Sequence, residues 1–409
     1  MSATDPRESP VRLAIVVSHP IQHFVHFYRA LAARPDIDLH VFYASRIGVE
    51  RYFDKAMGTE IEWAGDMLSG YPHSFLPEAG SIKRTGFRAV NNPSIHAALD
   101  GFVPDALIVY GYSQMTQLRA QWWAWRHKVP TLMISDTNAV TERGTLKKAA
   151  RDALLAQIYE RTGAFLCPGD QNEVALRRHG VPATKLYRCP FTIDEARHLK
   201  ARGERAEARA AIAAEHGIDP AAFVGLYIGK LIARKRPQDA IRAFAEARRA
   251  GAKVHLVLCG NGAMMEELKA LAAAEDAPVT LAGFVNIDRL PDYYAAADAL
   301  VHPAENDPHP LICSEAAAVG LPMILSDKVG TIGPTDVSRP DANTLVVPCG
   351  DVGALGAAIR RMADDPALVA EMGRQSQRIY GETDMGHAVA GVERALDALV
   401  RQGRNARAA

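Results

Sequence analysis

Short apolar runs alternate with amphipathic stretches along this chain, and the alternation occurs twice. The apolar runs cover residues 13–17, 37–43, 106–110, 131–135 and 164–167 in the first half, and residues 224–228, 254–258, 279–282, 299–302, 323–325 and 344–347 in the second. Continuous apolar runs are typical of strands covered on both faces, and intervening helices indicate a parallel sheet. The sequence therefore predicts an α/β chain with two doubly wound, Rossmann-like domains.

A charged, alanine-rich stretch over residues 194–218 separates the two sets of runs and has no strand character. We interpret residues 196–218 as a linker between a first domain, residues 1–195, and a second domain, residues 219–382. In the last segment, 383–409, we expect a helix near 387–401 that folds back on the first domain. Two such domains face a central cleft at the carboxyl ends of their strands, where sheets of this kind bind ligands.

The balance of charge and the cysteine pattern exclude several classes of protein. Forty-seven basic side chains offset 47 acidic ones, which argues against a nucleic-acid partner. The five cysteines are dispersed and form no C-x-x-C pair, so we expect buried thiols in or beside strands rather than disulfides or a zinc site. The first 12 residues are polar and no apolar run reaches the roughly 18 to 20 residues of a membrane span, so we expect a cytoplasmic protein.

A basic turn, GKLIARKRP over residues 229–237, directly follows one of the predicted strands. Gly229 permits close approach of the backbone, and Lys230, Arg234, Lys235 and Arg236 place four cations just before a predicted helix. Anions are favoured at such a place, because unpaired backbone N–H groups and the helix dipole add to the side-chain charge. Taken alone, a basic turn of this kind is more often a solvated surface than a phosphate site.

Two carboxylates follow a later strand, in the segment HPAENDPHPLICSEAAAVGLP over residues 302–322. Asp307 and Glu315 are separated by seven residues, which places one in a loop and the other in the first turns of a helix, both near the cleft. Vicinal hydroxyls of ribose or of a sugar need such acceptors. The alternative is a capping aspartate and a surface glutamate.

Together these residues resemble the C-terminal half of retaining nucleotide-sugar glycosyltransferases of family 4, the group 1 type, which have the two-domain fold called GT-B. The resemblance rests on four elements in order over residues 224–379: Gly229 with Lys230 and Lys235; the GNG turn of Gly260 and Gly262; the segment 283–303; and the acidic pair followed by AAAVGLPMI. Residues 18–32, 66–71 and 132–138 resemble a subgroup of the same enzymes more loosely.

The resemblance implies a role for each matching residue. Lys230 and Lys235 would hold the donor diphosphate and offset charge on the leaving group, Glu315 would bind the ribose, and Asp307 would face the donor sugar. The remaining donor-binding residues implied are Gly229, Gly260, Gly262, Phe284, Val285, Asn286, His309, Leu311 and Ile312. His19 in the loop SHP either donates to phosphate or acceptor, or caps the helix that Pro20 begins.

The resemblance also implies a reaction: transfer of a sugar from a nucleoside-diphosphate sugar, with retention of configuration and with neither metal nor cofactor. The acceptor would be a saccharide, a lipid-linked saccharide or a small molecule, in polysaccharide or glycolipid biosynthesis. The basic segment 147–161 adds an expectation of peripheral contact with the inner face of the membrane.

The chain departs from the family pattern at three places, one of which is the loop of Ser18, His19 and Pro20, where the family often has a glycine pair near the diphosphate. Asp307 replaces the usual glutamate, so that Glu305 is an alternative, and His309 and Pro310 stand where an aromatic residue and a glycine are common. A nucleotide-sugar 2-epimerase and a catalytically silent nucleotide-sugar-binding protein therefore stay open as other functions.

Overall fold

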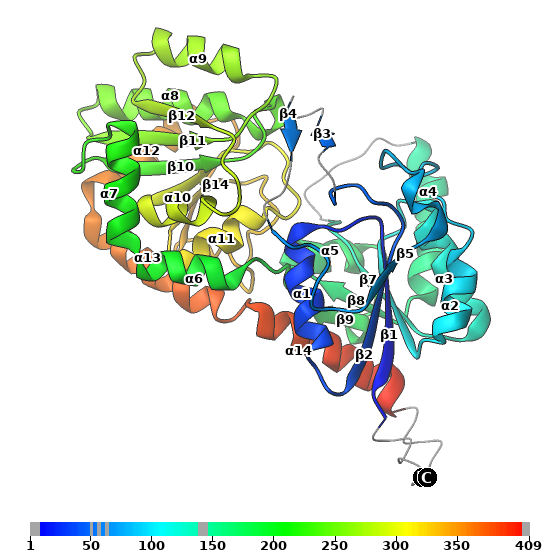
Figure 1. Ribbon diagram of the computed structural model, residues 1–409. Helices are drawn as coiled ribbons and strands as arrows, with labels where there is room; N and C mark the ends of the chain where they lie inside the picture. Colours follow the sequence, from blue (N-terminus) through cyan, green and yellow to red (C-terminus); the bar gives the residue numbers. More distant parts are fainter. Residues whose placement is uncertain (1–8, 50–51, 55–58, 62–64, 138–145, 403–409) are drawn as a thin grey trace.

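The computed structural model describes residues 9–49, 52–54, 59–61, 65–137 and 146–402 (Figure 1). The side chains of residues 52–54, 59–61 and 146–153 lie outside this description. The expectation of a cytoplasmic protein rests partly on segment 1–8, which lies outside the described residues. The same holds for most of the basic side chains of segment 147–161.

The first domain is built on a parallel sheet whose described strands have the order β5-β2-β1-β6-β7-β8-β9. These strands are β1 (Val11–Val17), β2 (Ile37–Tyr43), β5 (His73–Phe75), β6 (Ala106–Tyr110), β7 (Thr131–Ile134), β8 (Ala164–Cys167) and β9 (Leu186–Arg188). Leu13 and Ile15 belong to one apolar core and Ala14 and Val16 to another, because successive residues of a strand point to opposite faces. The sheet is therefore covered on both sides, as the continuous apolar runs predict.

Helices α1 (Gln22–Ala32), α2 (Ile95–Phe102), α3 (Met115–His127), α4 (Leu146–Arg161) and α5 (Asp170–Arg178) surround this sheet (Figure 1). An antiparallel pair, β3 (Tyr52–Asp54) and β4 (Thr59–Ile61), stands apart from it. Short 3-10 turns cover Pro77–Gly80 and Ala183–Lys185.

The second domain repeats the plan with the strand order β12-β11-β10-β13-β14-β15 in the described chain. Its strands are β10 (Phe223–Ile228), β11 (Val254–Cys259), β12 (Val279–Gly283), β13 (Ala299–His302), β14 (Met323–Ser326) and β15 (Thr344–Val347), all parallel. Its helices are α8 (Pro237–Arg249), α9 (Met265–Ala274), α10 (Leu290–Ala296), α11 (Leu311–Val319), α12 (Val352–Asp364) and α13 (Pro366–Tyr380). Two doubly wound domains confirm the predicted fold class.

The structure differs from our interpretation of residues 196–218 as a linker. This stretch forms α6 (Glu195–Gly203) and α7 (Arg205–His216). Ile212 is buried in the core of the second domain, and Arg209 donates to the carbonyl oxygens of Ala296 (2.5 Å) and Ala222 (2.6 Å). The alanine-rich face of these helices packs on the domain, and Arg202, Arg205 and Arg209, which looked like linker residues, donate to its carbonyl oxygens.

Within residues 146–402 the chain crosses between the domains twice. The first crossing leads from β9 into α6, and the second leads from α13 into α14 (Met385–Leu396), which lies along the first domain (Figure 1). Ala388 and Val392 of α14 are buried in the same core as β1, and a π-helical turn, Asp397–Arg401, follows. Glu195 joins the two crossings, because its Oε1 accepts hydrogen bonds from Tyr380 Oη (2.8 Å) and from the backbone N–H of Met385 (2.7 Å).

A second contact between the domains, which we call the interdomain clasp, consists of Asp170 at the start of α5 and Asp336 after β14. Asp336 is 2% exposed, and its Oδ2 accepts the backbone N–H of Asp170 (2.9 Å) while its Oδ1 accepts that of Val337 (2.8 Å). The Asp170 carboxylate in turn accepts the backbone N–H (2.8 Å) and the hydroxyl (2.5 Å) of Thr335. A Cβ atom at Gly169 would lie 2.1 Å from Asp336 Oδ2, so only glycine fits there.

Cysteines 167, 189, 259 and 313 are buried free thiols, whereas Cys349 is half-buried. Cys313 lies in α11 rather than beside a strand. No helix in the described ranges combines the length and the apolar character that crossing a bilayer requires.

Candidate donor site at the carboxyl edge of the second sheet

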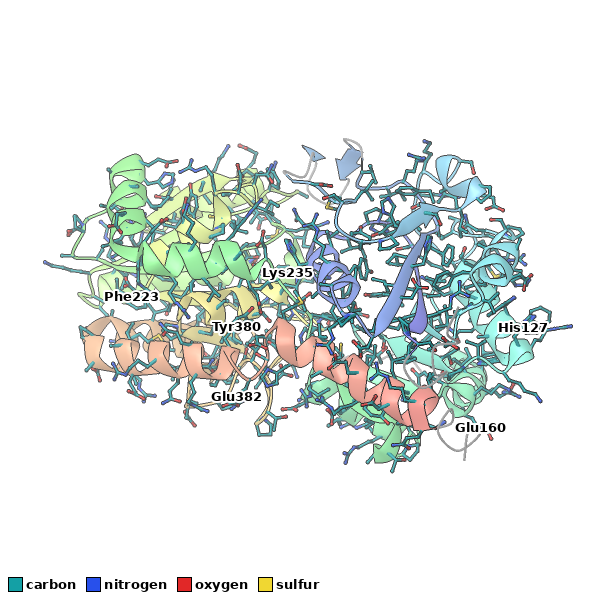
Figure 2. The ribbon with its side chains drawn as sticks, turned by 60° about the horizontal axis from the view of Figure 1, so that its bottom comes forward. His127, Glu160, Phe223, Lys235, Tyr380 and Glu382 are labelled. Carbon is teal, nitrogen blue, oxygen red and sulfur yellow. The ribbon has the colours of Figure 1, made fainter. Side chains whose placement is uncertain are left out.

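The basic turn brings Lys235 to the side of the second domain that faces the first (Figure 2). Lys235 ends a 3-10 turn, Ala233–Lys235, and Pro237 begins α8 two residues later. Its ammonium group forms an ion pair with Asp307 Oδ2, and only 12% and 13% of the two side chains are exposed. The structure thus joins two of the predicted catalytic residues in one buried pair.

Asp307 also bonds to a residue that the sequence reasoning missed. His302, at the end of β13, lies with its Nε2 2.7 Å from the same Oδ2 and is 1% exposed. Burial raises the pKa of Asp307, but the hydrogen bond from His302 and the Lys235 charge outweigh burial and lower this pKa to about 2. Burial lowers the pKa of His302, so a neutral imidazole donates to an ionised carboxylate.

The glycines of the basic turn and of the GNG turn lie against each other at the ends of β10 and β11. A Cβ atom at Gly260 would lie 1.9 Å from the carbonyl oxygen of Gly229, and one at Gly262 would lie 2.5 Å from that of Leu231. Gly229 and Gly260 also have φ angles of 155° and 154°, in a region that favours glycine. Glycine is therefore required for these two turns to meet.

Glu315 lies in α11, and Tyr294 Oη donates to its Oε2 at 2.5 Å. The predicted nucleobase segment, Phe284 to Asn286, follows β12, and the carbonyl oxygen of Asn286 accepts the backbone N–H of Leu290 at 3.0 Å. Val285 and Ile312 pack against the core of the second domain. Tyr294 therefore holds one oxygen of the carboxylate that we assigned to ribose.

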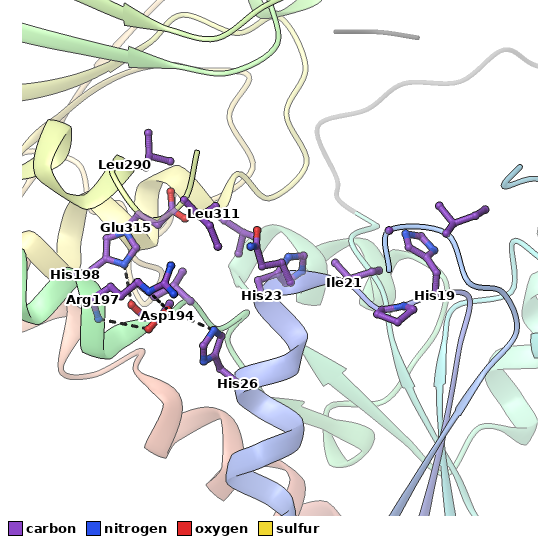
Figure 3. Close-up of a pocket in the computed structure, with 16 residues that line it drawn as sticks. His19, Ile21, His23, His26, Asp194, Arg197, His198, Leu290, Leu311 and Glu315 are labelled. Carbon is purple, nitrogen blue, oxygen red and sulfur yellow. Dashed lines mark hydrogen bonds and ion pairs between the residues drawn. The ribbon is translucent and has the colours of Figure 1, made fainter. Parts of the chain in front are cut away.

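A cavity of about 400 Å³ lies between the domains beside Glu315 (Figure 3). Its lining comes from α1 and the preceding loop, from α6 and from the second domain: His19, Pro20, Ile21, Gln22, His23, His26, Ile47, Gly48, Ile193, Asp194, Arg197, His198, Ile287, Leu290, Leu311 and Glu315. Among the predicted site residues, His19, Leu311 and Glu315 line this cavity. The lining does not include Lys230, Lys235, Asp307 or the three glycines. The predicted diphosphate residues therefore lie outside the cavity, and Asp307 precedes the helix α11 that lines it.

Histidines gather on the first-domain side of the cavity. His19 lies 2.7 Å from Ser18 Oγ through its Nδ1, and burial lowers its pKa to about 4. His26 lies 3.6 Å from Asp194 Oδ2. Burial lowers the pKa of His23 to about 3, so His19 and His23 are neutral near pH 7.

His309, which we expected at the donor, packs its ring against Phe191 of the first domain at 5.0 Å, and burial lowers its pKa to about 4. Glu305, the alternative to Asp307, is exposed. Its backbone N–H donates to the carbonyl oxygen of Arg234 at 2.9 Å. Of the two acidic residues, Asp307 is the one that the structure joins to Lys235.

The sequence reasoning missed several residues that surround these places: His302, Tyr294, His23, His26, Asp194, Arg197 and His198. A histidine directly at the carboxyl end of a buried strand was a usable signal for His302. Tyr294 carried none, because its role depends on a partner 21 residues away.

Residues 208–379 match the family described as glycosyl transferases group 1. Alpha-D-kanosaminyltransferase of Streptomyces kanamyceticus is 24% identical over 319 residues, which are 74% of this chain and 77% of that protein. The lipopolysaccharide core biosynthesis glycosyltransferase LpsD of Rhizobium meliloti is 33% identical over 150 residues, which are 36% of this chain and 41% of LpsD.

The crystal structure of Anabaena HepE (Alr3699) in complex with UDP and glucose has a similar fold, with a TM-score of 0.70 at 12% identity, over 95% of this chain and 100% of HepE. Its likeness covers both domains. The second domain of this chain is therefore similar to the glycosyl transferases group 1 family, and the whole chain has the two-domain fold of the HepE structure.

Proposed function

We propose that this chain is a retaining glycosyltransferase that moves a sugar from a nucleoside-diphosphate sugar to a hydroxyl acceptor. The observation that carries the proposal is the buried ion pair of Lys235 and Asp307, at the strand ends beside the interdomain cavity. A leaving diphosphate develops negative charge, and a cation already desolvated and oriented stabilises that charge better than a solvated one.

The donor would lie along α11. Lys230 and Lys235 would hold the diphosphate over the glycine turns, Asp307 would face the transferred sugar, and Glu315 would accept hydrogen bonds from ribose. The HepE structure, a complex with UDP and glucose, supports a nucleotide-sugar donor for a chain of the same fold.

The reaction would need no metal and no cofactor. Metal-dependent sites of this kind use a divalent cation to neutralise phosphate charge, whereas the basic turn supplies Lys230, Arg234 and Lys235 in place of that cation.

The acceptor would enter from the first domain, where His19 and His23 line the cavity. We propose a saccharide of a cell-surface polysaccharide or glycolipid, in line with the name of LpsD.

Trp122 and Leu154 are 48% and 56% exposed on α3 and α4 beside Arg126 and Arg161. This patch supports peripheral contact of a cytoplasmic protein with the anionic inner face of the membrane.

One experiment tests the proposal. The chain is mixed with UDP-, GDP- and dTDP-sugars and a panel of saccharide acceptors, with and without EDTA, and early products are analysed by proton NMR. We expect a new glycoside with the anomeric configuration of the donor, formed equally in EDTA. Inversion would contradict the retaining reaction, and a need for added magnesium would contradict transfer without a metal. Release of an epimerised sugar, or binding without turnover, would contradict glycosyl transfer itself.

A further inference from the structure

Two donors converge on a single oxygen of Asp307. Both the Lys235 ammonium group and His302 Nε2 contact Oδ2. Among the residues that the structure describes, none donates to Oδ1, although 13% of the side chain is exposed. The backbone is fixed as well, since the carbonyl oxygen of Asp307 accepts the N–H of Gly330 at 2.8 Å. The carboxylate is therefore held in one rotation, with one oxygen engaged and the other open.

The side chain of His302 makes one hydrogen bond within the described chain, the one to Asp307. Its Nδ1 is buried without a partner. A neutral imidazole carries its proton on the nitrogen that has an acceptor, so Nε2 is the protonated nitrogen and donates to Asp307. Leaving Nδ1 unpaired in the interior costs free energy, and the contact with Asp307 is the interaction that offsets this cost.

We propose that His302 is a positioning residue, which fixes the Asp307 carboxylate through Nε2–H so that Oδ1 is the oxygen presented to the donor sugar. This inference rests on the proposed role of Asp307. Without His302, the carboxylate is free to rotate and offer both oxygens to Lys235, because a single ammonium group does not fix its plane. The histidine thus supplies the orientation that the short aspartate side chain cannot provide alone.

Several titratable or charged groups face this carboxylate from the elements around it: Lys235 and Arg234 of the basic turn, Tyr227 of β10, His302 of β13, His309, and Cys313 of α11. Of these, His302 and Lys235 form hydrogen bonds to Asp307. Replacing His302 therefore removes one of two direct donors and leaves the surrounding charges in place.

The test compares wild type, His302→Phe and His302→Gln. Phenylalanine keeps the ring volume and removes the donor, whereas glutamine returns an N–H near the position of Nε2. We expect His302→Phe to lower kcat at least about tenfold, the value of a lost hydrogen bond to a charged group, with little change in KM for the donor. Glutamine should restore most of this loss, and the melting temperatures of both variants should agree.

A second readout does not need turnover. Carbon NMR of labelled aspartate carboxyls follows the titration of Asp307, whose pKa should rise in His302→Phe and stay low in His302→Gln. Equal kcat in all three proteins, parallel losses in both variants, or an unmoved Asp307 titration would overturn the inference. A wild type that transfers no sugar refutes the proposed function instead, and the titration still decides whether His302 holds the carboxylate.

Discussion

Replacing Asp336 by asparagine exchanges one of the two carboxylate oxygens of this residue in the interdomain clasp for an NH₂ group, and the shape of the side chain does not change. Each oxygen of the Asp336 carboxylate accepts one backbone N–H, that of Asp170 across the boundary or that of Val337 beside it. Asparagine has only one carbonyl oxygen, so its NH₂ group must face one of the two donors. Because Val337 is the adjacent residue, we expect the oxygen to stay with Val337 and the conflict to fall on Asp170.

The size of the effect follows from that lost bond. A hydrogen bond to a charged acceptor contributes about 1.5–3 kcal/mol, and Asp170 is half-buried where it donates to the opposite domain. Its hydrogen exchange should therefore accelerate about 10- to 150-fold in Asp336→Asn, because each 1.4 kcal/mol corresponds to about a factor of ten. The measurement is amide exchange by NMR at pH 8, above the pKa of about 7 to which burial raises Asp336.

Asp351→Asn is the matched control. Asp351 also accepts a backbone N–H, from Ala354 at 2.8 Å, but it caps α12 on the exposed surface of the second domain. Asparagine keeps a carbonyl oxygen for this single N–H, so the variant should leave exchange at both Ala354 and Asp170 close to wild type. Unaltered exchange at Asp170 in Asp336→Asn would refute the reasoning, because it would mean that the cross-domain hydrogen bond does not protect that amide.

Three further outcomes are expected. Lys235→Ala should lower transfer at least about 100-fold, or about 3 kcal/mol, with the fold intact by circular dichroism, and near-normal turnover would contradict its role. Glu315→Gln should weaken the binding of both the free nucleoside diphosphate and the donor in calorimetry, whereas Asp307→Asn should spare the nucleoside diphosphate, and equal losses in both variants would contradict the two assignments. The pKa of Asp307 is about 2 against an ordinary 3.8, so its contribution of about 2 kcal/mol is present above pH 4 and lost as the pH falls from about 4 to about 2. Urea unfolding of wild type and Asp307→Asn at pH 7 and pH 3 checks this, and a difference independent of pH would count against it.

The sequence was sufficient for the strands that are buried on both faces. The runs over 37–43, 106–110 and 299–302 coincide with β2, β6 and β13, because a short continuous apolar run is typical of a strand that is covered on both faces. Strands β5 and β9 were not predicted. They are three residues long, half-buried and at the sheet edges, so they carry no pattern that distinguishes them from loops.

The candidate donor site was likewise predicted only in part from the sequence. The basic turn and the acidic pair were found from their residue types and spacing, and the GNG turn was found from its resemblance to the family. The contact of His302 with Asp307, and that of Tyr294 with Glu315, depend on how β13, α10 and α11 pack, which no local spacing encodes. The histidines of α1 and the polar residues of α6 meet only because the two domains face each other.

Glu195 binds both crossings of the chain, so a rotation of one domain against the other that kept these hydrogen bonds would have its axis close to this carboxylate. Displacement in a rotation grows with distance from the axis. Asp194 and Arg197, which line the cavity next to Glu195, would therefore keep their neighbours as the domains turn, while atoms farther along the lining sweep a longer arc. A ligand bound against α6 would keep its contacts there while the opposite wall of the cavity moves. The two ends of the cavity would therefore differ in how far they can move.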